Sequence, residues 1–175
     1  MSRPGTPPPD EPRPDEPRPD AALLDAALLD ALRAHTTLTL AYADADGPQA
    51  CAVLYAIGAD ASLVFVTAAT TRHGRALSVA PAVPVAFTAQ ADGQEWTALT
   101  GVQGRGVCRR LADGPERDAA WRAYTERHPF VTADPRLQSA LESTALWAIH
   151  PTWLRLIDNS RGFATKLEWQ SPPES

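Results

Sequence analysis

The sequence predicts a mainly β protein, a six-stranded antiparallel barrel with flanking helices. Apolar runs of strand length recur along the chain, separated by short turns such as ADGPQ at 45–49. A longer run, Gln94 to Leu111, contains three glycines, which inside a strand usually mark bulges or bends. Such bends let a long strand turn the corner of a small barrel, so barrel closure explains the glycines.

The first ordered element is expected to be a helix over 20–34. Leu24, Leu28 and Leu32 recur every four residues there and form one apolar stripe, and Asp20 stands in the N-cap position. The AALLD pentad occurs only twice, which is too few copies for a coiled coil. The stripe therefore predicts ordinary packing of this helix on the core.

The remaining elements follow from periodicity and from turn residues. Strands are predicted at 36–43, 50–57, 62–68, 83–89, 94–111 and 144–157. Helices are predicted at 71–80, 114–127 and 134–143, with a break at 128–130 and with Pro81 ending the first of them. Tight turns between the first three strands predict an antiparallel meander.

The 175 residues predict one domain of 21–170 between a leader and a short tail. Residues 1–20 hold eight of the 17 prolines and a near repeat, PDEPRPDEPRPD, so they are expected to be a disordered leader. Residues 171–175 are expected to be a flexible tail. The 44% hydrophobic content is enough for a core in the domain between them.

Charge and composition exclude several classes of function. The formal net charge is −5, which argues against nucleic acid as a partner, because a nucleic-acid backbone needs a broad basic surface. No segment resembles a secretion signal or reaches membrane-spanning length, so we expect a cytoplasmic protein without membrane contact. The four histidines are scattered, and Cys51 and Cys108 have no neighbouring cysteine. We expect buried free thiols and no metal site.

The segment TTRHGRAL, residues 70–77, concentrates hydroxyls and cationic side chains where a strand leads into a helix. Thr70 or Thr71 is expected to cap the helix, and Arg72 and Arg75 add charge-assisted donors. One interpretation is a site for a small phosphorylated ligand. The other, equally weighted, is a well-capped helix with solvated arginines.

Arg105, Arg109 and Arg110 form the second basic cluster. Odd and even positions of a strand face opposite ways, so these arginines are expected to be divided between two surfaces. Either a phosphate or surface ion pairs would satisfy them there.

The order of elements and three segments, TRHGRAL, GVQGRGVCRRL and RLIDNSRGF (155–163), resemble the pyridoxamine 5'-phosphate oxidase-related split barrels, most closely their YhbP-like branch. The resemblance covers about residues 30–170. It implies a homodimer that binds FMN at the subunit interface, with the phosphate held by one protomer and the ring flanked by both.

The resemblance also implies which residues bind the cofactor. The family's phosphate-binding strand end and helix start fall on Val66, Thr67, Thr71, Arg72 and His73, and its flavin edge falls on Ala50, Cys51, Ala52 and Val53. Trp153 and Asn159 fall where the family's chain crosses toward the partner's flavin. The alternative interpretation of DNSRG (158–162) is a turn in which Asp and Asn bond their own backbone.

The chain departs from the oxidases at three positions that have a binding role in that family. His73 stands where they have a lysine, Asn159 where they have an arginine, and Ile157 where they have a substrate-binding histidine. We therefore expect an FMN-dependent oxidoreductase acting on another small organic substrate, and we name no general acid or base. Two alternatives stay open: a carrier of haem, deazaflavin or free FMN on the same barrel, and a family member whose pocket is empty.

Overall fold

The computed structural model describes residues 21–58 and 60–171, and the predicted leader lies outside them. Seven strands form one antiparallel sheet: β1 (Thr37–Asp44), β2 (Gly47–Ile57), β3 (Leu63–Val66), β4 (Val83–Gln90), β5 (Thr100–Arg110), β6 (Leu146–Asp158) and β7 (Lys166–Gln170). The helices are α1 (Ala21–Arg33), α2 (Arg72–Leu77), α3 (Pro115–Arg127), α4 (Phe130–Ala133) and α5 (Pro135–Glu142). The predicted mainly β class with flanking helices is confirmed.

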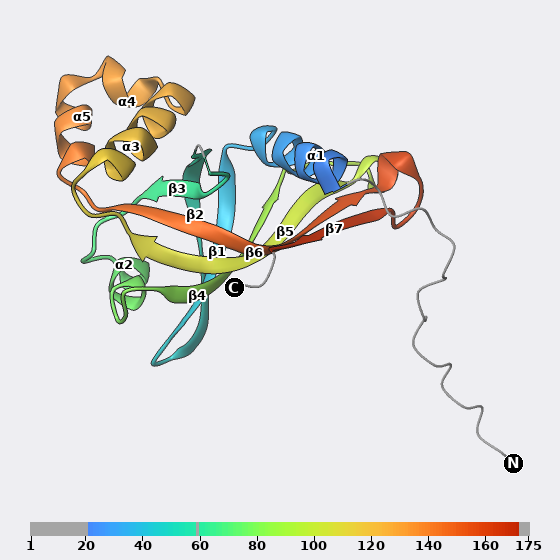
Figure 1. Ribbon diagram of the computed structural model, residues 1–175, viewed down its shortest axis with the longest axis horizontal. Coiled ribbons are helices and arrows are strands. Elements are labelled where there is room, and N and C mark those ends of the chain that lie inside the picture. The colour runs from blue at the N-terminus through green and yellow to red at the C-terminus, as the bar shows by residue number, and fades with distance from the viewer. Residues whose placement is uncertain (1–20, 59, 172–175) are drawn as a thin grey trace, which may run out of the picture.

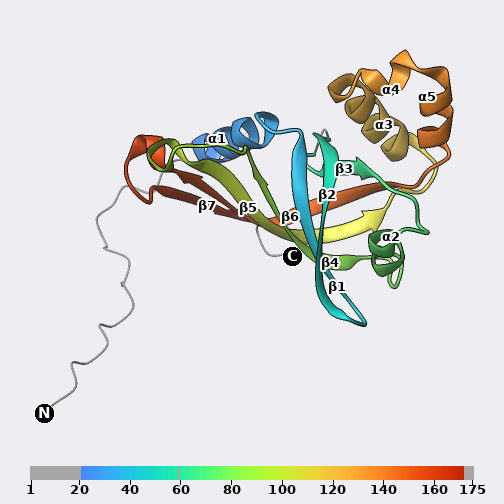
Figure 2. The ribbon, with the colours of Figure 1, turned by 180° about the vertical axis from the view of Figure 1, so that it is seen from behind.

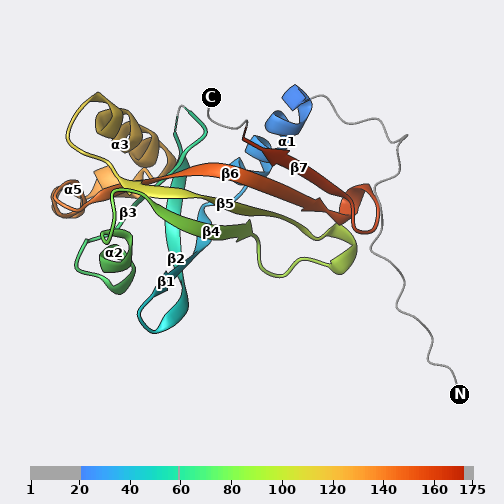
Figure 3. The same ribbon diagram turned by 60° about the horizontal axis from the view of Figure 1, so that its bottom comes forward.

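Six of the strands form a closed ring. The strand order is β3-β2-β1-β4-β5-β6-β7, and β3 also pairs with the first residues of β6. The second half of β6 pairs instead with β7, which extends the sheet beyond the ring. Figures 1 to 3 show α1 lying across the region of β5 and β7, and α3, α4 and α5 gathered at the opposite end of the molecule.

Two apolar clusters hold these layers together. The larger fills the barrel under α1, where Leu28 and Leu32 pack with interior residues of the strands such as Phe65 and Trp147. Leu24, also expected in this stripe, has a side chain outside the described residues. The smaller cluster lies between α3, α4 and the outer face of β3 and β6, and it includes Val64 and Tyr124.

The predicted strand at 94–111 is wrong at its start, because residues 94–99 form a loop. The Gln94 side chain accepts a hydrogen bond from the Thr100 backbone N–H (2.9 Å) and donates one to the Thr100 carbonyl (2.9 Å). This bond pair closes a loop that contains the 3-10 turn Trp96–Ala98, and β5 begins only at Thr100. A side chain bonding to the backbone competes here with the sheet ladder.

Three other elements differ from expectation. The helix predicted at 71–80 ends at Leu77 with Ser78 as its C-cap, well before Pro81. The break predicted at 128–130 leads directly into a short helix, α4. A seventh strand, β7, is present in the C-terminal part of the domain, where no helix or strand had been predicted. The 3-10 turn Asn159–Arg161 reverses the chain and brings this strand back alongside β6.

The glycines of β5 allow close packing at two positions. The Phe87 ring lies over Gly104, where a Cβ atom would be 2.2 Å from the ring. At Gly106 a Cβ atom would be 2.4 Å from the His150 carbonyl oxygen. The predicted irregularity is present, because the pairing of β5 with β6 shifts register between Arg105 and Gly106.

The close contact at Gly104 predicts a destabilised variant. Gly104→Ala is expected to lower the free energy of unfolding by about 1–3 kcal/mol, because the added methyl group overlaps the Phe87 ring. Denaturant titration measures this change. In the Phe87→Leu background the same substitution should cost clearly less, and an equal cost in both backgrounds would contradict the assigned cause.

His128 predicts how stability depends on pH. Its ring is buried and Nε2 donates to the Tyr55 carbonyl at 3.0 Å. Burial lowers the pKa of His128 below its ordinary value of 6.5, and burial also lowers the pKa of His35 and of His73. The unfolded chain therefore binds more protons just below pH 6.5, and the free energy of unfolding should fall as pH drops from 7.5 to 5.5.

Denaturant titrations at both pH values test this expectation in the wild type and in His128→Gln. Glutamine keeps a donor for the Tyr55 carbonyl but does not titrate, so the variant should lose less stability over this range. An unchanged pH dependence in the variant would show that His128 is not responsible. The carboxyl groups whose pKa is lowered, Asp44 and Asp60, titrate below this range, because their ordinary value is 3.8.

Candidate functional site

Thr67 lies directly after β3, at the point where the barrel closes. Its backbone N–H donates to the Ala145 carbonyl at 3.1 Å, and its own carbonyl accepts from the Trp147 indole N–H at 3.1 Å. Both partners belong to β6 or to the residue before it. The closure of the ring thus determines where the Thr67 hydroxyl stands.

Thr67 forms a compact cluster with Thr71 and His73, which we call the hydroxyl–histidine cluster. Thr71 is the N-cap of α2, and its hydroxyl accepts from the Gly74 N–H (3.0 Å) and donates to the Ala68 carbonyl (2.8 Å). The Thr67 hydroxyl is 3.2 Å from that of Thr71 and 2.6 Å from Nε2 of His73. Three of the residues predicted for phosphate binding are therefore in contact.

The electrostatic state of the cluster follows from its burial. Desolvation lowers the pKa of His73, which favours a neutral ring near pH 7. The Tyr42 ring lies beside it, with ring centroids 6.4 Å apart. The histidine thus supplies one N–H donor and little positive charge, unlike the lysine of the oxidases.

Arg72 turns away from the cluster toward the β1–β2 hairpin. Its guanidinium donates to Asp44 through Nε (2.7 Å) and through a second nitrogen (3.3 Å), and to Asp46 at 2.7 Å. The Arg72 side chain is 48% exposed and that of Asp46 79%, so the Arg72–Asp46 pair is a surface ion pair that exchanges at low energetic cost, whereas the Asp44 side chain is only 18% exposed. The hydrogen bond from Arg72 lowers the pKa of Asp44.

The predicted flavin edge on β2 alternates between two faces. Ala50 and Ala52 are exposed, whereas Val53 is buried and Cys51 is half-buried toward the core. Burial also raises the pKa of the Cys51 thiol. Only the two alanines present their side chains to a ligand outside the barrel. Val66, at the end of β3, is half-buried against the cluster under α3.

Strand register places small residues in one row across the outer face of the sheet. Ala50 pairs with Ala41, Ala41 with Ala86, Ala86 with Arg105, and Arg105 with Trp153. Paired residues of neighbouring strands project from the same face. Ala50 and Trp153, which the family resemblance had singled out separately, therefore share one face of the sheet.

A groove of about 620 Å³ follows part of this row, and we call it the Arg105–Trp153 groove. It is lined by Ala41, Tyr42, Ala43, Pro84, Val85, Ala86, Arg105, Gly106, Val107, Thr152, Trp153 and Gln170. Tyr42 belongs both to this lining and to the surroundings of His73. The Tyr42 side chain is buried on the inner face of β1, opposite to Ala41 and Ala43, so the hydroxyl–histidine cluster and the groove lie on opposite faces of this strand.

Asn159 is not brought to these residues within the chain. Its side-chain amide donates to the Trp96 carbonyl (2.7 Å) and accepts from the Ala164 N–H (3.1 Å). Asp158 caps the same turn by accepting from the Ser160 N–H at 3.1 Å. The turn lies at the β6–β7 end of the molecule, away from α2 (Figure 1). DNSRG thus forms a turn in which Asp158 bonds the turn's own backbone, while Asn159 also bonds Trp96 of another loop.

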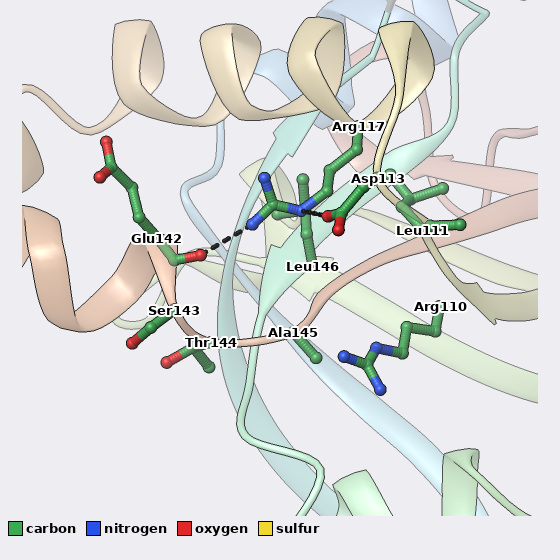
Figure 4. A pocket seen from close by; sticks show the side chains of 10 residues that line it. Arg110, Leu111, Asp113, Arg117, Glu142, Ser143, Thr144, Ala145 and Leu146 are labelled. Carbon is green, nitrogen blue, oxygen red and sulfur yellow. Dashed lines mark hydrogen bonds and ion pairs between the residues drawn. The ribbon is translucent and has the colours of Figure 1, made fainter.

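A second hollow, of about 600 Å³, lies where α3 and α5 meet the start of β6 (Figure 4). Arg117 crosses it and donates to the Glu142 carbonyl at 2.8 Å, with Asp113 3.6 Å away. Figure 4 shows the Glu142 carboxylate pointing away from this arginine. Arg117 therefore fastens α3 to the end of α5, and none of the predicted site residues lines this hollow.

Across residues 21–58 and 60–171, no group of three or more His, Cys, Asp or Glu side chains has the geometry of a metal site. Every helix in the same part of the chain is too short or too polar to cross a membrane.

Several residues of the site were not identified from the sequence. Asp44 and Asp46 are far from Arg72 in sequence, and a turn signal alone gave no reason to place them beside it. Arg105 had been grouped with Arg109, but Arg109 pairs with Glu116 of α3, whereas Arg105 lies over Trp153. The sequence offered only the odd position of Arg105 within its strand. The pairing of Arg105 with Ala86 of β4 and with Trp153 of β6 is visible only in the structure.

Known proteins are similar to this chain in sequence or in architecture. UPF0306 protein YhbP of Salmonella schwarzengrund is 37% identical over 108 residues, which cover 62% of this chain and 66% of that protein. Among solved structures, a haem binding protein from Mycobacterium smegmatis has a TM-score of 0.65 at 21% identity, covering 89% of this chain and 60% of the other. An FAD binding protein from the same organism has a TM-score of 0.58 at 18% identity, covering 84% and 96%.

The two structural likenesses support the fold of the chain. The matched segment spans just under two thirds of the length of the YhbP relative. The sequence model described as "Pyridoxamine 5'-phosphate oxidase" matches residues 24–158, which include α2, the hydroxyl–histidine cluster and all of β6. The chain therefore belongs to the pyridoxamine 5'-phosphate oxidase family of split barrels.

Proposed function

We propose that this protein binds FMN at a homodimer interface and acts as a flavin-dependent oxidoreductase on a small organic substrate. The observation that carries the proposal is the hydroxyl–histidine cluster at the start of α2, together with Arg72 of the same helix and the exposed alanines of β2. Membership of the oxidase family and the likeness to an FAD binding protein support a flavin as the ligand.

Some of the residues at the start of α2 are suited to bind an FMN phosphate. The Arg72 guanidinium forms a planar fork suited to phosphate, and of its two present partners Asp46 is exposed and Asp44 is half-buried. The Thr67 and Thr71 hydroxyls already bond within the cluster, so they position His73 and the start of α2 rather than standing free. In this proposal Arg72 exchanges Asp46 for the phosphate, and His73 donates one hydrogen bond.

The exposed face of β2 supports a second copy of the chain as the partner. On this strand, Pro48, Ala50, Ala52 and Leu54 are exposed in succession. These small apolar side chains form a surface on which another protomer or a flat ring can lie without steric obstruction. A second protomer and a flavin ring can occupy this surface together, because a ring bound at the dimer interface would lie between the two copies.

The flavin itself would supply the redox chemistry at its isoalloxazine ring. The contribution of the chain is to hold the phosphate through Arg72, to present the flat alanine edge of β2, and to exclude water through the second protomer. Because Ile157 and Asn159 replace the oxidases' histidine and arginine, we propose a substrate other than pyridoxamine phosphate.

A haem carrier is the second candidate, and the likeness to a haem binding protein is the observation that favours it. Haem iron needs an axial ligand. Nε2 of His73 is bonded to Thr67 and Nε2 of His128 to the Tyr55 carbonyl, so neither is poised to serve. An absorption spectrum after incubation with haem or with FMN distinguishes the two candidates.

FMN titration followed by fluorescence quenching tests the proposed function. Arg72→Ala should weaken FMN binding by about tenfold or more, because a charge-assisted contact to the phosphate is lost. Arg136→Ala removes an exposed arginine of α5 and is the matched control, expected to bind as the wild type does. Absence of FMN binding by the wild type would exclude the flavin function.

Asp46 provides an independent test of the same arrangement. Asp46→Asn removes a negative charge next to Arg72 with little change of shape, so FMN should bind about threefold tighter at low ionic strength. The control is Asp118→Asn, which removes an exposed charge on α3. Equal affinities of wild type and Asp46→Asn would place the phosphate away from Arg72.

A further inference from the structure

We propose that the Arg105–Trp153 groove binds a flat organic anion and that Arg105 selects its negative charge. Arg105 belongs to β5 and Trp153 to β6, and the two are directly paired across the sheet. The proposal rests on how the groove is built, on the charge of Arg105 and on the shape of the groove floor.

A β-bulge shapes the groove at its centre. Arg105 pairs with Trp153, but Gly106 pairs with Pro151, so Thr152 is an extra residue in β6. The Thr152 hydroxyl donates to the Arg105 carbonyl at 3.3 Å, and its carbonyl accepts from the Ser171 N–H at 3.0 Å. Bulges reorient neighbouring side chains and are frequent beside binding sites. Here the bulge holds the backbone at the point where Arg105 and Trp153 emerge.

The charge of Arg105 is not neutralised within the described part of the chain. Its guanidinium carbon lies 4.9 Å from the centroid of the Trp153 ring, in a cation–π contact. Arg155 lies over the same ring at 4.9 Å, but Glu168 accepts from it at 2.7 Å. No carboxylate among residues 21–58 and 60–171 pairs with Arg105. An anionic ligand would supply the missing partner.

The floor of the groove favours a flat molecule. The side chains of Ala41, Ala43 and Ala86 end at Cβ, and Gly106 has no side chain. A planar group can therefore lie in van der Waals contact with the sheet while its edge reaches the Trp153 ring. The volume of about 620 Å³ is in the range of small-molecule sites, which are typically apolar with a few polar groups. An aromatic carboxylate has this combination of features.

The groove and His73 lie on opposite faces of β1, because Ala41 and Ala43 line the groove on the outer face and the Tyr42 ring lies beside His73 on the inner face. Identification of this ligand as the substrate of the oxidoreductase rests on the proposed function. The binding of the ligand itself is independent of the proposed function, because the groove is formed by residues of β1, β4, β5 and β6 without a contribution from a flavin.

Isothermal titration calorimetry with naphthalene-2-carboxylate and with the neutral naphthalene-2-carboxamide tests the proposal. The carboxylate should bind the wild type about tenfold tighter or more, because Arg105 adds a charge-assisted contact. Arg105→Gln should abolish this preference, whereas Arg105→Lys should retain part of it. Arg110→Gln is the matched control, since Arg110 is exposed on the same strand and outside the groove.

The position of the probe is tested by NMR of the indole N–H groups. The Trp153 signal, assigned by its loss in Trp153→Phe, should shift on adding the carboxylate. Equal affinity for both probes, an undiminished preference in Arg105→Gln, or exclusion of the probe by a second copy covering the groove would each overturn the proposal.

FMN titration of the same preparations separates the two proposals. If the carboxylate preference depends on Arg105 and FMN does not bind, only the flavin function fails. If FMN binds and the carboxylate preference is absent, only the present inference fails.

Discussion

The pairing of β3 with β6 is the constraint on which the rest of the structure depends. It joins four residues of β3, Leu63 to Val66, to the first residues of β6 and so closes the ring of six strands. Without it, the barrel interior would open along this seam and expose the core around Phe65 and Trp147. The same pairing ends at Thr67, whose backbone is bonded to Ala145 and to the Trp147 indole. The candidate phosphate site is thus built directly on the closure of the barrel.

The outer face of the sheet carries the second half of the site. β6 pairs with β5 along nearly its whole length and, on its other edge, with β3 at its start and with β7 in its second half, so it contributes to the closed ring and to the open extension. The bulge at Thr152 lies within its pairing with β5, and the groove opens there. The Tyr42 ring lies beside His73 on the inner face of β1, whereas Ala41 and Ala43 line the groove on the outer face. A cofactor phosphate on α2 and a flat ligand in the groove would therefore lie on opposite faces of this strand.

Local sequence patterns predicted much of the fold. The apolar stripe of Leu28 and Leu32 placed α1 on the core, and the turn at 45–49 predicted the β1–β2 hairpin. Thr71 was expected as one of two possible N-caps and is the cap. Each of these features depends on residues a few positions apart, which is why periodicity and turn chemistry detect them. The loop closed by Gln94 was missed, because a side chain that bonds to the backbone of Thr100 leaves no periodic signal.

The sequence by itself determined the mainly β class, the order of most elements, the family and the cluster of hydroxyls and histidine at the start of α2. Only the tertiary structure decided that Arg72 is bound by Asp44 and Asp46, that Asn159 stabilises a distant turn, and that Arg105 stands over Trp153 beside a row of alanines. The physical reason is that these arrangements join residues far apart in the sequence, and that of Arg105 and Trp153 also depends on strand register and on a bulge. A shift of one residue would turn these two side chains to the other face of the sheet, and no local pattern encodes that choice.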